Sequence, residues 1–251
     1  MIYFNNSEVI DWRYNAQQMN LVYHDDAVIF GKEPIKGIGV EDFNFNFNFK
    51  NYDAATHSVP NDPTANWQQD LVLNGTPVVD TDHITITNSD AYYQYQFAST
   101  NDNIFNRNSS PLMTIIFKVS NCTQGTDLIS NRGSGYNWMV RPQGSNRMCL
   151  HDSSGEKGNL YVTTNPNIVV MKVNASKTLT NMSITDNIST TASNLNFNNL
   201  SNRLCFFCSN FSGTAGSISE RFSGTCYWMF QANRVLTDDE ITQVVNFNEN
   251  L

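Results

Sequence analysis

The amino-acid sequence predicts an all-β chain: a β-sandwich with a small N-terminal β-hairpin module and one short C-terminal helix. Short apolar segments recur along the chain with polar turns between them, as in sandwich and barrel folds. Asn makes up about one residue in seven, and its side chain favours turns over helix interiors. One capping-box pattern, at residues 237–240, predicts where the helix begins.

The first forty residues contain a repeated pattern. Residues 2–10 and 22–29 each hold an apolar stretch, an Asn or Asp pair and a second β-branched stretch. Asn and Asp tolerate the backbone angles of tight turns, so each copy predicts a β-hairpin. A unit of this size is marginally stable alone. It either packs on the following domain or attaches the chain to copies of itself or to a host structure. We therefore interpret residues 1–40 as an attachment or oligomerisation module, carried by Tyr3, Phe4, Val9, Ile10, Val22, Tyr23, Val28 and Ile29.

Residues 31–39 are rich in Gly and Pro and predict a linker, so the sandwich is expected over residues 41–251. Residues 43–49 alternate strictly between Phe and Asn, which predicts a half-buried strand with the Phe side in the core. A stacking strip for sugars is the alternative for these rings. The other predicted strands are residues 83–87, 92–97, 113–119, 127–130, 137–141, 148–151, 168–173, 180–185, 203–209 and 225–231.

The C-terminal helix is predicted from its first turn. Thr237 stands at the N-cap position and Glu240 at the reciprocal position three residues later. Acids in this turn face the positive end of the helix dipole, which explains them without a metal or catalytic role. Ile241, Val244 and Val245 are spaced to face a core.

Residues 222–231, followed by residues 233–241, resemble the C-terminal signature of laminin-G-like, concanavalin A-like jelly rolls. Residues 67–75, 113–117 and 168–173 resemble upstream segments of the same family, so the resemblance spans residues 43–250. It implies a jelly-roll β-sandwich. The usual Asn-Gly hairpin is replaced by Asn174-Ala175-Ser176, and no pair of acids matches the family's calcium site. No cofactor is therefore expected, and calcium has no clear motif.

The N-terminal repeat followed by a laminin-G-like domain resembles virion proteins of gut bacteriophages, including crAss-like phages. The resemblance implies a head fibre, capsid decoration or tail fibre, with other virion proteins and copies of itself as partners. Neither a signal-peptide pattern nor an apolar stretch long enough to span a bilayer is present in the sequence. The expected location is the virion, after synthesis in the bacterial cytoplasm and without membrane insertion.

Composition and motifs argue against two other functions. The net charge of −8 and the lack of a Lys/Arg run exclude an ordinary nucleic-acid binder. Glucanases of this fold carry a Glu-x-Asp-x-Glu strand, which this chain lacks. No His stands in a nucleophile-elbow context. We expect no enzymatic activity, and a glycoside hydrolase is the least favoured alternative.

Glycan binding is the remaining question, because concanavalin A-like sandwiches often bind glycans, on a host surface or in mucus for example. Trp67, Tyr136 and Trp138 stand in or beside predicted loops and are the candidate sugar-stacking residues; core packing is the alternative for each. Trp228 is assigned to the core because it alternates with other buried-type residues. The five cysteines do not form a disulfide pattern, and Cys205 and Cys208 are interpreted as apolar strand residues rather than a redox or zinc site.

Overall fold

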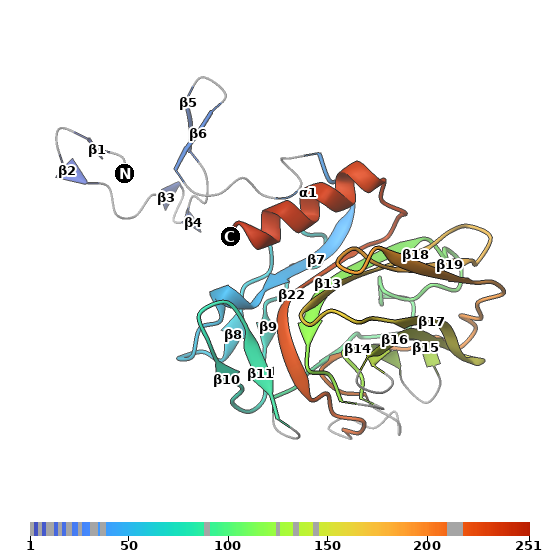
Figure 1. The fold of residues 1–251 in the computed structure, drawn as a ribbon. Coiled ribbons are helices and arrows are strands. Elements are labelled where there is room, and N and C mark those ends of the chain that lie inside the picture. The colour runs from blue at the N-terminus through green and yellow to red at the C-terminus, as the bar shows by residue number, and fades with distance from the viewer. Residues whose placement is uncertain are drawn as a thin grey trace.

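A computed structural model of the chain shows two β-sheets packed face to face, with one helix on the far side of the larger sheet (Figure 1). It describes residues 35, 39–87, 91–123, 126–132, 136–142, 146–209 and 218–251. Of Tyr136 it describes the backbone alone, as it does for six short strands between residues 3 and 30.

The larger sheet has eight antiparallel strands in the order β10-β11-β22-β13-β18-β19-β20, and β7 also pairs with β22. Two strands pair with the same side of β22: β11 with its first residues and β7 with its last. The strands are β7 (Phe43–Asn48), β10 (Val78–Val79), β11 (Ile84–Ile86), β13 (Met113–Ser120), β18 (Asn167–Val173), β19 (Leu179–Ser183), β20 (Ile188–Ala192) and β22 (Gly224–Ala232).

The smaller sheet has six strands in the order β12-β21-β14-β15-β16-β17. They are β12 (Tyr93–Gln96), β14 (Ile129–Arg132), β15 (Tyr136–Pro142), β16 (Arg147–Asp152), β17 (Gly155–Tyr161) and β21 (Arg203–Phe206). The 3-10 helix η2 (Phe49–Asn51) and a separate pair, β8 (Ser58–Val59) with β9 (Leu71–Val72), follow β7 in the chain.

The N-terminal repeat forms hairpins, as predicted. The antiparallel pairs are β1 (Tyr3–Phe4) with β2 (Ser7–Glu8) and β5 (Val22–His24) with β6 (Ala27–Phe30). A third pair that the sequence did not reveal, β3 (Arg13–Tyr14) with β4 (Gln17–Gln18), lies between them. Its strands carry Arg and Gln instead of the apolar residues that define the repeat.

Each of the ten other predicted strands overlaps a strand of the structure, but the two-residue strands β8, β9 and β10 were missed, and so were the longer strands β17 and β20. Both are edge strands of their sheets, and β20 alternates only weakly because most of its residues are exposed. In β17, Gly158 adopts a φ of +58°, and a Cβ there would lie 2.6 Å from Leu179 Cδ2. This glycine lets the edges of the two sheets approach each other.

The alternating strand β7 corrects one prediction, because it is buried on both faces rather than on one. Phe45 and Phe47 face the smaller sheet, as expected. The Asn side is covered by the C-terminal helix and the end of β22. Asn44 Nδ2 donates to Gln231 Oε1 at 2.5 Å, and Asn48 Nδ2 donates to the Asn248 carbonyl at 3.0 Å. These bonds satisfy the amides of a strand face that the sequence predicted to be exposed to solvent.

Helix α1 (Asp238–Glu249) begins as predicted. Thr237 Oγ1 accepts from the Glu240 amide, and the Glu240 carboxylate accepts from the Thr237 amide at 2.8 Å, which completes the capping box. Ile241 and Val244 are buried against the outer face of the larger sheet, together with Trp228. Ile35 and Val40 belong to the same buried cluster, so packing onto the sandwich begins before residue 41.

Candidate ligand-binding sites

The two tryptophans proposed for sugar stacking are core residues. Trp138 is fully buried, and its Nε1 donates to the Phe105 carbonyl at 2.7 Å. Trp67 is 5 % exposed and packs edge-on against Phe47, Tyr95 and Phe105. Neither ring has a free face for a sugar. Both tryptophans therefore pack in the core, which was the alternative interpretation of the sequence.

The other candidates fall partly or wholly outside the described residues. Tyr136 pairs with Arg132 through its backbone, and its side chain is not described. Tyr3, Phe4, Val22, Tyr23, Val28 and Ile29 lie in strands β1, β5 and β6, whose side chains are not described. Val9 and Ile10 lie outside the described residues. Trp67 and Trp138, the two candidate aromatic residues whose side chains are described, both lie in the core cluster between the sheets.

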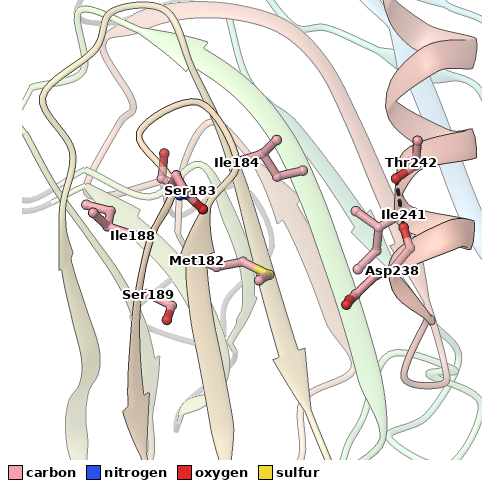
Figure 2. Close-up of a pocket in the computed structure, with 9 residues that line it drawn as sticks. Met182, Ser183, Ile184, Ile188, Ser189, Asp238, Ile241 and Thr242 are labelled. Atoms are coloured by element: carbon pink, nitrogen blue, oxygen red, sulfur yellow. Dashed lines mark hydrogen bonds between the residues drawn. The ribbon is translucent and has the colours of Figure 1, made fainter.

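A pocket that the sequence did not predict opens between α1 and the β19–β20 hairpin (Figure 2). Its volume is about 280 Å³, at the lower limit for small-molecule sites, roughly 300 Å³. Its lining residues are Met182, Ser183, Ile184, Asn187, Ile188, Ser189, Asp238, Ile241 and Thr242. We call it the helix–hairpin pocket.

The pocket exists because α1 covers only part of the outer face of the larger sheet. Ile116 pairs with Val170, and Val170 with Met182, so the three side chains form a row across that face. Ile116 and Val170 are fully buried beneath the helix, whereas Met182 is partly exposed. The row continues to Ser189 on the edge strand, where the helix no longer covers the sheet.

The lining combines apolar and polar groups in the way that a sugar ring requires. Ile184, which is 42 % exposed, and the partly exposed Met182 provide an apolar wall on the hairpin side. Asp238 and Thr242 project from the first turns of α1 toward this wall (Figure 2). Thr242 Oγ1 donates to the Asp238 carbonyl at 2.9 Å and keeps its capacity to accept, while the Asp238 carboxylate contacts Lys172 Nζ at 3.1 Å. Hydroxyl and carboxylate groups thus border an apolar surface.

Two sets of contacts hold the walls of this pocket in place. The Asp186 carboxylate, in the hairpin turn, accepts from the backbone amide of Thr163 at 2.6 Å and from that of Thr164 at 3.0 Å. The Lys172–Asp238 pair joins the start of the helix to β18. The pocket is therefore formed before any ligand binds, which reduces the entropy cost of binding.

A second polar region lies on the outer face of the smaller sheet. Arg141 Nε donates to Asp127 Oδ1 at 2.7 Å, and Arg141 Nη2 bonds to Glu220. Arg132 Nη1 lies 3.5 Å from the same Glu220 carboxylate. Asp127 is fully buried; burial raises the pKa of its carboxyl group, and Arg141 opposes that shift. Both acids are therefore engaged by Arg141.

Other reactive groups of the described residues do not form a site. No group of three or more His, Cys, Asp or Glu residues in the described ranges could hold a metal ion. All five cysteines are free and buried, and burial raises the pKa of Cys122 and Cys149 to about 12. Among the described helices, none has the length and apolarity needed to cross a membrane.

Comparisons with known proteins show the fold but not a family. No protein-family model matches the chain, and no curated protein sequence is significantly similar to it. Among solved structures, the binding domain of botulinum neurotoxin DC in complex with SialylT is 10 % identical with a TM-score of 0.55. The botulinum neurotoxin serotype D/C VPI 5993 binding domain is 12 % identical with a TM-score of 0.57. Each match covers 84 % of this chain and 52 % of the toxin chain.

A third similar structure is the Trypanosoma rangeli sialidase in complex with sialic acid, 10 % identical with a TM-score of 0.55. That match covers 85 % of this chain and 34 % of the sialidase chain. The chain therefore spans about half of the toxin binding domains and about a third of the sialidase. At these identities the likeness shows the architecture alone: the chain is an all-β, concanavalin A-like jelly-roll β-sandwich with an N-terminal hairpin module and one short C-terminal helix.

Proposed function

We propose that this chain is a non-enzymatic, glycan-binding β-sandwich, and that the helix–hairpin pocket is its binding site. The observation that carries the proposal is the pocket itself, where the apolar side chains of Met182 and Ile184 lie opposite Asp238 and Thr242 of α1, with Ser189 on the edge strand. A pyranose ring has the same two-sided character, with C–H groups on its faces and hydroxyls at its edge. The toxin and sialidase structures in complex with SialylT and with sialic acid support this ligand class by analogy of fold.

A binding role fits the pocket better than a catalytic role. Asp238 is the one carboxylate among its described lining residues. Glycoside hydrolysis ordinarily requires two carboxyl groups, placed about 5–9.5 Å apart. The Asp238 side chain is also 86 % exposed and lies 3.1 Å from Lys172 Nζ.

Two matched substitutions on β20 test the pocket. Ser189 lines the pocket and is exposed, so Ser189→Arg fills it without disturbing the core. Thr191 lies two residues further along the same face of the strand, is also exposed and does not line the pocket. On a glycan array, the unmodified chain and Thr191→Arg are expected to bind the same glycans, and Ser189→Arg is expected to bind none. Equal binding by all three chains, or no binding by the unmodified chain, contradicts the proposal.

We further propose that this domain belongs to a bacteriophage virion protein, such as a head fibre, a capsid decoration or a tail fibre. Three successive β-hairpins precede the sandwich, which supports an attachment or assembly role for the N-terminal region. A hairpin is too small to be stable alone and gains stability from a partner surface. The expected partners are other virion proteins and further copies of this chain.

The assembly role is tested by a deletion whose end point follows from the packing. Ile35 lies in the buried cluster beneath α1, so the deletion removes residues 1–34 and keeps Ile35. By light scattering, the full chain is expected to form an oligomer or to bind a capsid or tail component, and the shortened chain is expected to do neither. A full chain that is monomeric and binds no virion component contradicts this role and leaves the glycan proposal standing.

A further inference from the structure

Arg203 is a buried arginine whose guanidinium has no partner. The residue is 3 % exposed, and its Nε and Nη1 atoms are buried without a hydrogen bond. Arg107, which is equally buried, shows the ordinary arrangement: its Nε donates to the Phe105 carbonyl at 3.0 Å and its Nη1 to the Leu112 carbonyl at 3.3 Å. A buried cation without a partner is costly, and a bound anion would offset that cost.

The strand register places this guanidinium on the outer face of the smaller sheet. Leu204 and Phe206 of β21 belong to the core between the sheets, so the alternate residues Arg203 and Cys205 face outward. Cys205 is the Cα partner of Ser130 in β14. The β14–β15 ladder is irregular between Asn131 and Arg132, but Arg132 contacts the same Glu220 carboxylate as Arg141, which places it on this outer face, two residues beyond Ser130.

The charges on this face are not balanced within the described residues. Asp127 and Glu220 both bond to Arg141, and Glu220 also pairs with Arg132 at 3.5 Å. These two carboxylates match the two arginines that they contact. A third arginine on this face, Arg147, lies 3.4 Å from Glu156, so Arg203 is the fourth, and the described residues offer it no counter-charge.

A hydroxyl and an exposed amide stand beside the unpartnered cation. Ser130 is fully buried and its Oγ has no hydrogen-bond partner. Because Ser130 is paired with Cys205, it lies diagonally across from Arg203, within reach of a long side chain. Gln96 is the Cα partner of Arg203 on β12 and is exposed, so this side of the site is in contact with solvent.

From these contacts we propose that Arg203, with Ser130 and Gln96, forms a binding site for a small oxyanion. The ligand is the carboxylate or sulfate group of an acidic molecule. Two N–H groups of a guanidinium bind two oxygens of such a group in a bidentate manner, and a hydroxyl donates to an oxygen of the same group. This site lies on the other sheet from the helix–hairpin pocket and does not depend on it.

The test measures binding of sodium sulfate and of sodium glucuronate to the full chain by isothermal titration and by the shift in melting temperature. Glucose serves as the uncharged control, and sodium chloride holds the ionic strength constant. We expect saturable stabilisation by sulfate or glucuronate but not by glucose. Tighter binding of sulfate would indicate a site for a tetrahedral oxyanion, and tighter binding of glucuronate a site for a planar carboxylate. The absence of saturable stabilisation by either anion overturns the proposal.

Three variants locate the effect. Arg203→Met is expected to weaken anion binding at least about tenfold and not to lower the melting temperature in anion-free buffer, because it removes an unpaired charge. Arg203→Lys keeps the charge but lacks the planar guanidinium with its paired N–H donors, so an intermediate affinity is expected. Arg234→Met, which removes an arginine paired with Glu240 beside α1, is the control and is expected to bind anions normally.

Unchanged anion affinity in Arg203→Met overturns the proposal. If that variant does not fold, the Arg203→Lys titration and the arginine Nε–H resonances of the unmodified chain decide the question. A saturable shift of one such resonance on addition of sulfate or glucuronate supports the site, and the absence of any saturable shift rejects it.

Discussion

Arg234 and Glu240 form a two-bond ion pair across the start of α1. Arg234 Nη1 donates to Glu240 Oε2 at 2.8 Å, and Arg234 Nη2 donates to Glu240 Oε1 at 2.5 Å. Glu240 also completes the capping box with Thr237, and Arg234 Nε donates to the Glu41 carbonyl at 2.9 Å. The helix that forms one wall of the pocket is therefore tied to the end of β22 and to the segment before β7.

The contribution of Glu240 to the free energy of unfolding is expected to decrease at low pH. The hydrogen bonds from Arg234, followed by that from the Thr237 amide, lower the pKa of Glu240 from 4.5 to about 2. A depressed pKa contributes stability above the unfolded-state value, and this contribution is lost as the pH falls from 4.5 toward 2. Glu240→Gln should cost about 1 kcal/mol at pH 7, through the loss of a cap and an exposed pair.

The measurement is the difference in unfolding free energy between the unmodified chain and Glu240→Gln, from urea titrations at several pH values. The difference should shrink between pH 5 and about pH 2, because both side chains are then uncharged. Using the difference removes the contribution of other carboxyl groups that titrate in the same range. A difference that stays constant with pH would contradict this account of Glu240.

Substitution by Phe should lower the stability of the fold more at Trp138 than at Trp67. Trp138→Phe removes the hydrogen bond from Nε1 to the Phe105 carbonyl, which then keeps only the bond from Arg107 Nε. Trp67 Nε1 is buried without a partner, so Trp67→Phe loses no such bond. Both changes also lose packing, and Trp138→Phe should cost about 1–2 kcal/mol more. Chemical denaturation checks this order, and an equal or reversed order would contradict it.

The buried side-chain amides of β7 should need Asn248 of α1 as a hydrogen-bond partner. Asn248 Nδ2 donates to Asn46 Oδ1 at 3.0 Å, and Asn248 Oδ1 accepts from Asn48 at 3.3 Å. Asn248→Leu leaves these buried amides with missing partners and should destabilise the chain by about 2–3 kcal/mol. Asn246→Leu, at an exposed position of the same helix, is the matched control and should change stability by less than about 0.5 kcal/mol. Equal effects of the two substitutions would count against a buried amide network.

The cysteine thiols should be unreactive in the folded chain. All five are buried, and burial raises the pKa of Cys122 and Cys149 to about 12, so little thiolate exists at neutral pH. Ellman's reagent should label none of the five within minutes at pH 8 and all five in 6 M guanidinium. Rapid labelling of Cys205 or Cys208 in the native chain would reopen the redox interpretation of that pair.

Much of the fold could be predicted because its signals are local. The Phe-Asn alternation at 43–49 predicts a strand, and the Thr237–Glu240 spacing predicts a helix start, whatever lies around them. Strands β17 and β20 were missed because edge strands, exposed on one or both faces, need little apolar alternation.

The candidate sites could not be predicted in this way. Alternation shows that Trp138 and its neighbours face opposite sides of a strand, but it does not show which side is covered. The helix–hairpin pocket joins residues 182–189 to residues 238–242, and its shape depends on where α1 stops covering the sheet. A missing partner, such as that of Arg203, becomes visible only when every neighbouring strand is in place.

The sequence alone therefore determined the β-rich class, the hairpin repeat, the capped helix and the core role of Trp228, since each depends on spacing along a few residues. The tertiary structure decided that the Asn side of β7 is buried, that Trp67 and Trp138 are enclosed, and that a pocket opens beside α1. Burial is a property of what packs on a surface, and here the covering residues come from segments up to about two hundred positions away in the chain.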